Sequence, residues 1–218
     1  MAVTTRGLFV TGSDTGVGKT WIARQLVAQL VGSGASVKVR KPVESGCLMR
    51  DGSYYPADGD TLWQANGRRE SLDIVTPYRF EAALAPDRAA SLEGQRITLQ
   101  QVTTACQRGL QPDDFLLVEG AGGFYSPLCH DGLNADLATM LGLAVIVVCA
   151  DRLGAINQAL LTLAAVEQRG LEARALVLNR VDSSPMEDHL DNLSDLRRLC
   201  STPVYHCAYQ QPLQKVSL

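Results

Sequence analysis

Several features that mark particular classes of protein are missing from this sequence. Its six cysteines contain no Cys-x-x-Cys pair, and its three histidines are too few and too dispersed for a zinc site. No apolar run approaches the roughly 20 residues that a membrane-spanning helix requires. The first residues also lack the apolar stretch of a signal peptide. These absences predict a protein of the reducing cytoplasm with no membrane partner.

A surplus of positive charge is also missing. The chain carries 20 Lys and Arg against 23 Asp and Glu, which leaves a net charge of -3 and a pI of about 5.6. Without a basic surplus, we expect no nucleic-acid partner. The 218 residues are 46% hydrophobic and 20% charged, with a mean hydropathy of +0.01. This composition is typical of globular proteins, and the length predicts one α/β domain that spans residues 1–218.

Short apolar runs alternate with segments of helical periodicity along the chain. We predict strands at 7–11, 37–39, 115–118, 144–149, 175–178 and 204–207, and helices at 19–31, 61–65, 98–110, 155–168 and 186–199. We expect segments 44–59 and 78–94 to be mostly loop. The alternation predicts an α/β fold with a doubly wound, mostly parallel sheet flanked by helices. Ligands of such sheets bind beyond the carboxyl ends of the strands, so the turns there should carry the functional residues.

A glycine-rich turn with the sequence GSDTGVGKT joins the first predicted strand to the first predicted helix. Backbone N–H groups of such a turn, with the helix N-terminus behind them, bind the phosphates of a nucleotide. The usual loop has glycine five residues before Gly18, where this chain has Ser13, so the loop is a longer variant that begins at Gly12. Gly-Lys-Thr alone would be weak evidence, but between a strand and a helix it predicts ATP binding. The expected nucleotide contacts in this turn are Gly16, Val17, Gly18, Lys19, Thr20 and Trp21.

Four sequence blocks are together more specific than the glycine-rich turn alone. They are FVTGSDTGVGKT at 9–20, KPVESG at 41–46, VEGAGG at 118–123 and LGAINQALLT at 153–162. In this order they resemble the dethiobiotin synthetase family. The resemblance implies a P-loop NTPase-like fold, a homodimer, and the use of ATP and Mg²⁺. Members form a carbamate from CO2 on an amine of 7,8-diaminopelargonate, phosphorylate it to a carbamic-phosphoric anhydride, and close the ring of dethiobiotin, a step of biotin biosynthesis.

The resemblance implies that Lys41 is the catalytic lysine, together with Lys19 of the phosphate loop. Two converging ammonium groups can stabilise the charge that spreads over the oxygens of a γ-phosphoryl group in transfer. Pro42 keeps Lys41 in an extended conformation at the end of its strand. By the same resemblance Ser45 contacts the substrate, and Thr15 is a second candidate for holding the carbamate.

A magnesium site is expected around Glu119, which ends a buried strand where an unpaired carboxylate would be costly. The resemblance implies the oxygen ligands Thr20, Asp60 and Glu119, with water and phosphate completing the shell. Asp58 is two residues from Asp60 and stays open as the alternative ligand. After Glu119, the residues expected to lie close to the nucleotide are Gly120, Ala121 and Gly122.

The resemblance also implies residues for the base and for the substrate tail. Asn179 would read the adenine ring, with Arg180 bordering it, because an amide can both donate and accept a hydrogen bond. Gly154 and Asn157 open a helix whose free N–H groups suit the substrate carboxylate, from either subunit of a homodimer. Segment 205–209 lacks the family's Gly-x-Ile-Pro turn near the base, so the preference for a particular purine stays open.

Two other functions remain open from the residues alone. A switch ATPase of the chromosome-partitioning type shares the loop and the sheet. Such proteins carry a second lysine early in the loop, however, where this chain has Ser13 and Asp14. A related P-loop amidoligase with another acid substrate would share the fold as well. The blocks at 41–46 and 153–162 favour the diamine substrate over both alternatives.

Overall fold

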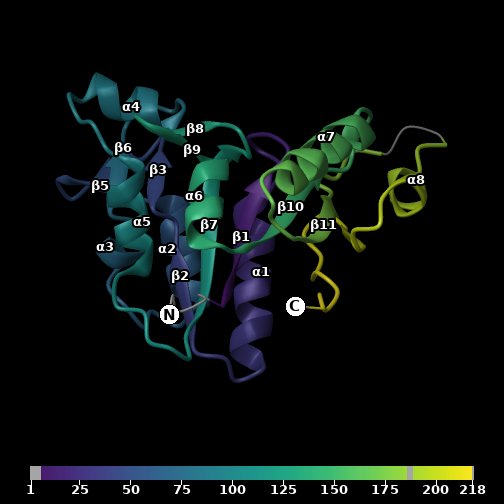
Figure 1. The fold of residues 1–218 in the computed structure, drawn as a ribbon, viewed down its shortest axis with the longest axis horizontal. Helices are drawn as coiled ribbons and strands as arrows, with labels where there is room; N and C mark the ends of the chain where they lie inside the picture. The colour runs from purple at the N-terminus through teal and green to yellow at the C-terminus, as the bar shows by residue number, and fades with distance from the viewer. Residues whose placement is uncertain (1–5, 186–188, 218) are drawn as a thin grey trace.

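A parallel six-stranded sheet forms the centre of the molecule, for which a computed structural model describes residues 6–185 and 189–217 (Figure 1). Its strand order is β12-β11-β10-β1-β7-β2, and every neighbouring pair runs parallel. This confirms the prediction of a doubly wound α/β fold. The strands are β1 (Gly7–Gly12), β2 (Val37–Arg40), β7 (Phe115–Gly123), β10 (Ala144–Ala150), β11 (Ala173–Asn179) and β12 (Val204–Cys207).

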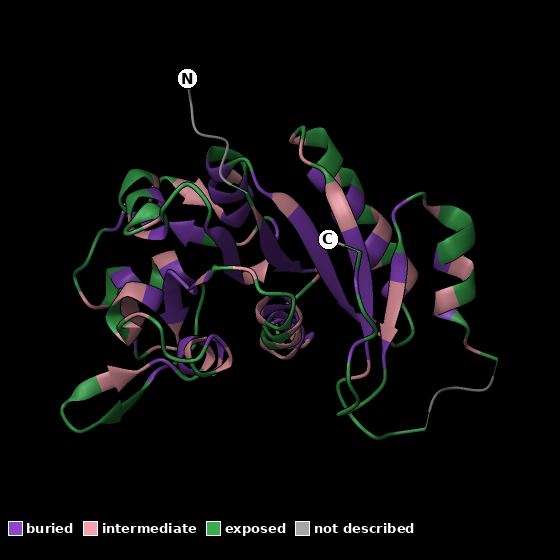
Figure 2. Ribbon diagram, turned by 90° about the horizontal axis from the view of Figure 1, so that it is seen from below, coloured by how far each residue is buried: buried purple, intermediate pink, exposed green. Residues whose placement is uncertain are grey.

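Helices cover both faces of this sheet, and each face has its own apolar core. The central strands are buried along most of their length (Figure 2), because alternate residues of β10 enter opposite cores: Val145 and Val147 on one face, Ile146 and Val148 on the other. This burial on both faces explains why β10 reads as one unbroken apolar run. The helices are α1 (Lys19–Gly32), α2 (Ala57–Ala65), α3 (Leu72–Val75), α4 (Pro86–Leu92), α5 (Leu99–Gln107), α6 (Asn134–Leu141), α7 (Ala155–Gln168) and α8 (Asn192–Leu199).

Three small two-stranded sheets lie outside the central one. Strand β3 (Val43–Ser45) follows the carboxyl end of β2 along the chain, and it pairs in parallel with β6 (Tyr78–Phe80). The hairpins are β4 (Leu48–Arg50) with β5 (Ser53–Tyr55), and β8 (Pro127–Cys129) with β9 (Gly132–Leu133). Across the described residues, the structure contains no helix that is both long and apolar enough to cross a membrane.

Local signals predicted some elements well and failed at others. Helix α7 and strand β12 have the predicted bounds, and Thr98 caps α5 through a reciprocal pair of hydrogen bonds with Gln101. The predicted loops were wrong in part, because segment 44–59 holds β3, β4, β5 and the start of α2, and segment 78–94 holds β6 and α4. The helix predicted at 186–199 begins only at Asn192, where Asp191 caps it, and residues 186–188 lie outside the described residues. Helix α6 was not anticipated at all.

Candidate active site

The phosphate loop connects β1 to α1 at the carboxyl edge of the sheet. Gly16 and Gly18 adopt left-handed conformations, with φ values of 75° and 86°. Gly18 is the N-cap of α1 and no side chain caps that helix, so its first N–H groups face the loop and suit an anion. Lys19 is buried and its Nζ donates to the backbone oxygen of Asp14 at 3.0 Å, across the loop. This is the geometry of a phosphate-binding nest.

Lys41 lies at the centre of a cluster assembled from four parts of the chain. Its Nζ is 2.7 Å from Glu119 Oε1 and 3.2 Å from Asp58 Oδ2, and it donates to the backbone oxygen of Gly120 at 3.1 Å. Thr20 Oγ1, from the phosphate loop, donates to the same Glu119 oxygen at 2.8 Å. Lys41 and Glu119 are 3% and 0% exposed, so this ion pair is shielded from water. The structure therefore brings Thr20, Lys41 and Glu119 together, as the sequence predicted.

The cluster contains Asp58 and not Asp60, which was the residue predicted as a metal ligand. The Asp60 carboxylate accepts hydrogen bonds from Tyr55 at 2.6 Å and from Gln64 at 2.5 Å. It does not line the cleft that contains Lys41, whereas Asp58 does. The two positions differ because successive residues of a helix are rotated by about 100°, which places residues two apart on nearly opposite faces.

Burial and neighbouring charges set the ionisation of the cluster. Burial favours neutral Lys41, but the carboxylates of Glu119 and Asp58 outweigh it and raise the pKa of Lys41. Burial lowers the pKa of Lys19 to about 8, and the nearby charge of Lys41 adds to this effect. Burial raises the pKa of Glu119, with the charge of Lys41 opposing the shift. For Asp58 the charge of Lys41 overcomes burial and lowers its pKa. Lys41 is thus a charged ammonium at neutral pH.

The donor atoms at this point fit a magnesium ion. Thr20, Asp58 and Glu119 offer only oxygen, which Mg²⁺ prefers, and Mg²⁺ usually keeps waters and phosphate oxygens beside one or two carboxylates. The second oxygen of Glu119 is buried and accepts no hydrogen bond from any described residue. No cage of three or more His, Cys, Asp or Glu occurs in the described part of the chain. A cation here would therefore depend on oxygens of a bound nucleotide.

A cleft of about 390 Å³ surrounds the cluster. Ser45 lies in its wall, with its hydroxyl donating to the backbone oxygen of Leu84 at 2.7 Å. One wall residue, Glu44, was not predicted from the sequence, although its place three residues after Lys41, within the block at 41–46, was a usable signal. The lining residues are Thr15, Gly16, Gly18, Lys19, Thr20, Lys41, Glu44, Ser45, Asp58, Glu119, Ala121 and Gly122.

A second, smaller cavity of about 290 Å³ lies on the other side of the phosphate loop. Asn179 is 2% exposed and its Nδ2 donates to the backbone oxygen of Val17 at 2.9 Å. Its Oδ1 is buried without a partner among the described residues, which leaves a free acceptor. Tyr209 and Gln210 line this cavity and were not predicted, because they reach it from the end of the chain. The full lining is Gly16, Gly18, Trp21, Asn179, Arg180, Val181, Tyr209 and Gln210.

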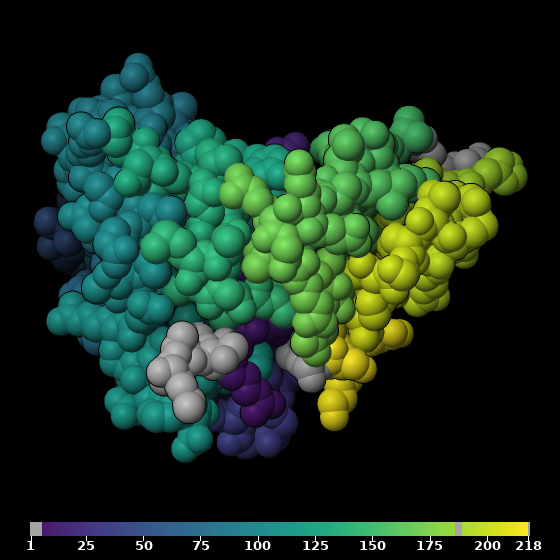
Figure 3. Space-filling model, viewed as in Figure 1, coloured from purple at the N-terminus to yellow at the C-terminus, as the bar shows by residue number. Residues whose placement is uncertain are grey.

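The predicted carboxylate site lies apart from the cleft. Gly154 and Asn157 stand exposed at the start of α7 and line neither cavity. Helix α7 lies on the visible face in the space-filling view (Figure 3). It exposes Leu161, which is 64% accessible. Within one chain, the structure does not bring Gly154 and Asn157 to the phosphate loop.

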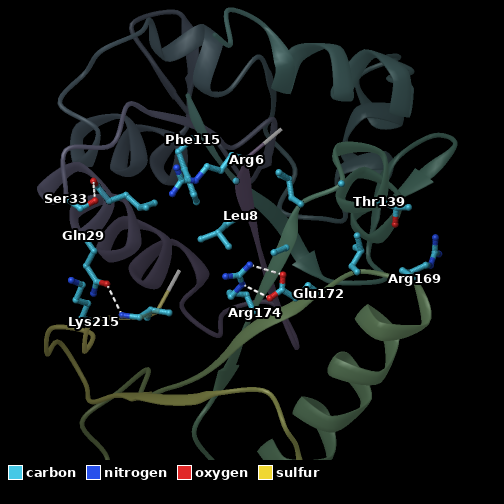
Figure 4. A pocket seen from close by; sticks show the side chains of 18 residues that line it. Arg6, Leu8, Gln29, Ser33, Phe115, Thr139, Arg169, Glu172, Arg174 and Lys215 are labelled. Carbon is cyan, nitrogen blue, oxygen red and sulfur yellow. Dashed lines mark hydrogen bonds and ion pairs between the residues drawn. The ribbon is translucent and has the colours of Figure 1, made fainter. Parts of the chain in front are cut away.

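A cavity of about 840 Å³ lies at the amino ends of the strands, at the opposite edge of the sheet from the phosphate loop (Figure 4). It holds several basic side chains, but two of them are already paired. Arg174 Nε is 2.7 Å from Glu172, and Arg169 is 2.5 Å from Asp136. We assign no role in the chemistry to this cavity, because none of the cluster around Lys41 reaches it.

The chain is similar to several known proteins. A family model described as an AAA domain matches residues 6–208. The chain is 40% identical over 207 residues to the ATP-dependent dethiobiotin synthetase of Rhodopirellula baltica, covering 90% of this chain and 81% of that protein. It is 38% identical over 201 residues to the ATP-dependent dethiobiotin synthetase of Bacillus subtilis, covering 91% of this chain and 85% of that protein.

Solved structures resemble the fold alone. The signal recognition particle receptor FtsY from Elizabethkingia anophelis aligns with a TM-score of 0.53 at 18% identity, over 98% of this chain and 61% of the receptor. A ParA family ATPase from Chlorobium tepidum aligns with a TM-score of 0.54 at 15% identity, over 95% of this chain and 85% of the ATPase. Both likenesses confirm the P-loop NTPase architecture.

Proposed function

Because this chain belongs to the dethiobiotin synthetase family, we propose that it converts 7,8-diaminopelargonate, CO2 and ATP into dethiobiotin, ADP and phosphate. The observation that carries the proposal is the placement of Lys41 beside the phosphate loop, in one cleft with Lys19 and Ser45. Residues 1–218 act as one domain, in the cytoplasm. All six cysteines are free thiols, as expected of a reducing compartment.

The reaction needs three bond-forming steps, and each balances without a redox partner. One amine of the substrate adds to CO2 and loses a proton, which gives a carbamate. A carbamate oxygen takes the γ-phosphoryl group of ATP and releases ADP. The second amine then attacks the carbamate carbon and expels phosphate, which closes the ureido ring.

The chain's own residues supply charge and position for these steps. The ammonium groups of Lys19 and Lys41 stabilise the charge on the phosphoryl group during its transfer. Thr15 and Ser45 stand in the wall of the same cleft, where they hold the carbamate. Binding both reactants in one small cleft also lowers the entropic part of the barrier.

Mg²⁺, held by Thr20, Asp58 and Glu119, would neutralise charge on the phosphates when it is bound. The ammonium of Lys41 contacts both carboxylates and balances their charge. Asp58 takes the ligand role that the resemblance implied for Asp60, because only Asp58 faces this point.

The adenine base belongs in the cavity that contains Asn179. Its free Oδ1 can accept from the exocyclic amino group of adenine, whereas guanine carries an acceptor at the corresponding position. Trp21 and Arg180 offer flat surfaces beside it. Gly120, Ala121 and Gly122 continue β7 past Glu119 and border the phosphates.

We assign the active assembly as a homodimer. Gly154 and Asn157 are exposed and do not line their own cleft, so the N-terminus of α7 would bind the substrate carboxylate for a partner subunit. Exposed Leu153 and Leu161, which are 69% and 64% accessible, give this part of the chain an apolar surface suited to a second copy.

One assay tests the proposed function. The purified chain is given ATP, Mg²⁺ and bicarbonate, and ADP release is measured with and without 7,8-diaminopelargonate, with dethiobiotin followed by mass spectrometry. We expect release to require the diamine and to match dethiobiotin formation one for one. ADP release that is the same with and without the diamine, or that increases when DNA or lipid is added, would contradict the proposal and favour a switch ATPase.

A further inference from the structure

Glu44 is a buried carboxylate that the chemistry described above does not use. It sits in the middle of β3, three residues after Lys41, and is 6% exposed. Its Oε1 accepts the backbone N–H of Asp58 at 2.9 Å, and its Oε2 accepts the backbone N–H of Gly59 at 2.9 Å. One side chain from a strand therefore binds two successive amides of a helix that begins 13 residues later, at Ala57.

Those two amides need an acceptor from elsewhere in the chain. The first turn of a helix has N–H groups with no partner inside the helix. The N-cap of α2 is Pro56, and no side-chain hydrogen bond caps this end of the helix locally. The first helical hydrogen bond runs from Asp60 N to the Pro56 oxygen, so the amides of Asp58 and Gly59 lie ahead of it. Glu44 thus caps α2 from β3 by accepting hydrogen bonds from two amides of the first turn of the helix.

The close approach of β3 to α2 depends on the residue at position 59. A Cβ atom on Gly59 would lie 1.9 Å from Thr76 Oγ1 and 3.4 Å from Glu44 Oε2. No side chain fits against Thr76 at that distance, so glycine lets the first turn of α2 rest directly on the Glu44 carboxylate. The contact is therefore built into the packing of both elements.

We propose that Glu44 is a positioning residue that fixes Asp58 in the magnesium-binding cluster. Asp58 is one of the two residues whose amides Glu44 binds, and its carboxylate reaches Lys41 Nζ at 3.2 Å. Glu44 is itself covalently tied to Lys41 through Pro42 and Val43. One bidentate contact thereby sets the position of an α2 carboxylate relative to the catalytic lysine. This inference rests on the proposed function of the cleft, and Glu44 acts in it only through Asp58.

Glu44→Ala removes both acceptors, and Glu44→Gln leaves one. Residues that orient metal ligands commonly change metal affinity by about 10- to 100-fold when they are replaced. We therefore expect Glu44→Ala to raise the Mg²⁺ concentration for half-maximal, diamine-dependent ADP release by at least about tenfold, and Glu44→Gln to lie between Glu44→Ala and the unmodified chain. Binding of ATP without Mg²⁺ should change by less than about twofold, since the phosphate loop is untouched.

A matched control separates positioning from stability. Thr98 caps α5 by accepting from Gln101 N, far along the chain and outside the cleft. Thr98→Ala should lower the melting temperature, as loss of any cap does, while leaving the Mg²⁺ requirement unchanged. Amide hydrogen exchange at Asp58 and Gly59, measured by NMR without metal or nucleotide, should accelerate in Glu44→Ala and stay slow in Thr98→Ala.

The outcomes distinguish this inference from the function beneath it. Equal Mg²⁺ requirements in Glu44→Ala and Thr98→Ala would overturn the positioning role. So would equally slow exchange of the two amides with and without Glu44. If Glu44→Ala does not fold, Glu44→Gln carries the same comparison. An unmodified chain that shows no diamine-dependent turnover would refute the proposed function instead, and the exchange measurement would still test the contact.

Discussion

Replacing Lys41 by methionine should reveal how strongly the resting cleft depends on one ammonium group. The change keeps most of the side-chain volume but removes the charge that lies 2.7 Å from Glu119 and 3.2 Å from Asp58. Glu119 is then left fully buried, with the Thr20 hydroxyl as its remaining donor among the described residues. Removing one partner of a buried ion pair typically costs about 3–5 kcal/mol. Such a loss is a large part of the roughly 5–15 kcal/mol that stabilises an ordinary domain.

The loss should depend on pH in a definite direction. Burial already raises the pKa of Glu119 above its ordinary value, and without Lys41 the pKa should rise further. The folded variant then holds a proton that the unfolded chain releases above the ordinary carboxyl pKa. Its stability therefore falls as pH rises from that ordinary value toward the raised one. We expect the destabilisation to be larger at pH 8 than at pH 5.

Urea denaturation of a double-mutant cycle measures this coupling. Lys41→Met, Glu119→Gln and the double variant are compared with the unmodified chain, and Lys38→Met serves as the control. Lys38 is partly exposed and 3.7 Å from Glu70, so its loss should cost less than about 1 kcal/mol. The double variant should recover much of the loss, with a coupling energy of about 2–3 kcal/mol.

The same variant tests the chemistry. Lys41→Met should bind ATP within a few-fold of the normal affinity, yet lower kcat by about 10²- to 10³-fold, because the lost charge acts mainly in the transition state. Additive stabilities in the cycle would refute the buried pair. Normal turnover by the variant would remove Lys41 from the mechanism.

Three further predictions follow from the same geometry. Asp58→Asn should raise the Mg²⁺ concentration for half-maximal ADP release at least about tenfold, whereas Asp60→Asn should leave it unchanged. A larger effect of Asp60→Asn than of Asp58→Asn would identify Asp60 as the ligand instead. Asn179→Ala should weaken ATP binding by about tenfold and GTP binding less, measured by calorimetry, and an equal loss for both would refute base reading. Iodoacetamide at pH 8 should modify the folded chain at Cys200, because Cys200 is the one cysteine of the six that is not fully buried. Cys106 should react more slowly, because burial raises its pKa to about 12. Peptide mass spectra that show Cys106 labelled first would contradict this packing.

Elements with strong local signals were predictable from the sequence. The apolar run of β10 is typical of a strand covered on both faces, and the glycine-rich turn before Lys19 is typical of a junction between a strand and a helix. These features depend on neighbouring residues, so a short window of sequence contains their cause. Weakly amphipathic or short elements, such as α4 and α6, offered no such signal and were missed.

The carboxyl end of β7 was predicted wrongly from the neighbouring residues. The sequence predicts that the strand ends at Glu119 and that glycines follow as a turn. In the structure β7 continues to Gly123, because Gly123 pairs with Gly12 of β1 after a shift in register. Pairing with a distant strand, rather than the composition of the segment, decides its conformation.

The sequence by itself determined the family and the parallel α/β architecture, because these follow from contiguous motifs and from periodicity. Only the tertiary structure shows that Asp58, and not Asp60, lies beside Lys41, and the rotation of α2 about its axis is the reason. That rotation is set in turn by Glu44, which holds the amides of Asp58 and Gly59 from another element. Two aspartates two residues apart are chemically alike, so only packing between β3 and α2 can choose which one faces Lys41.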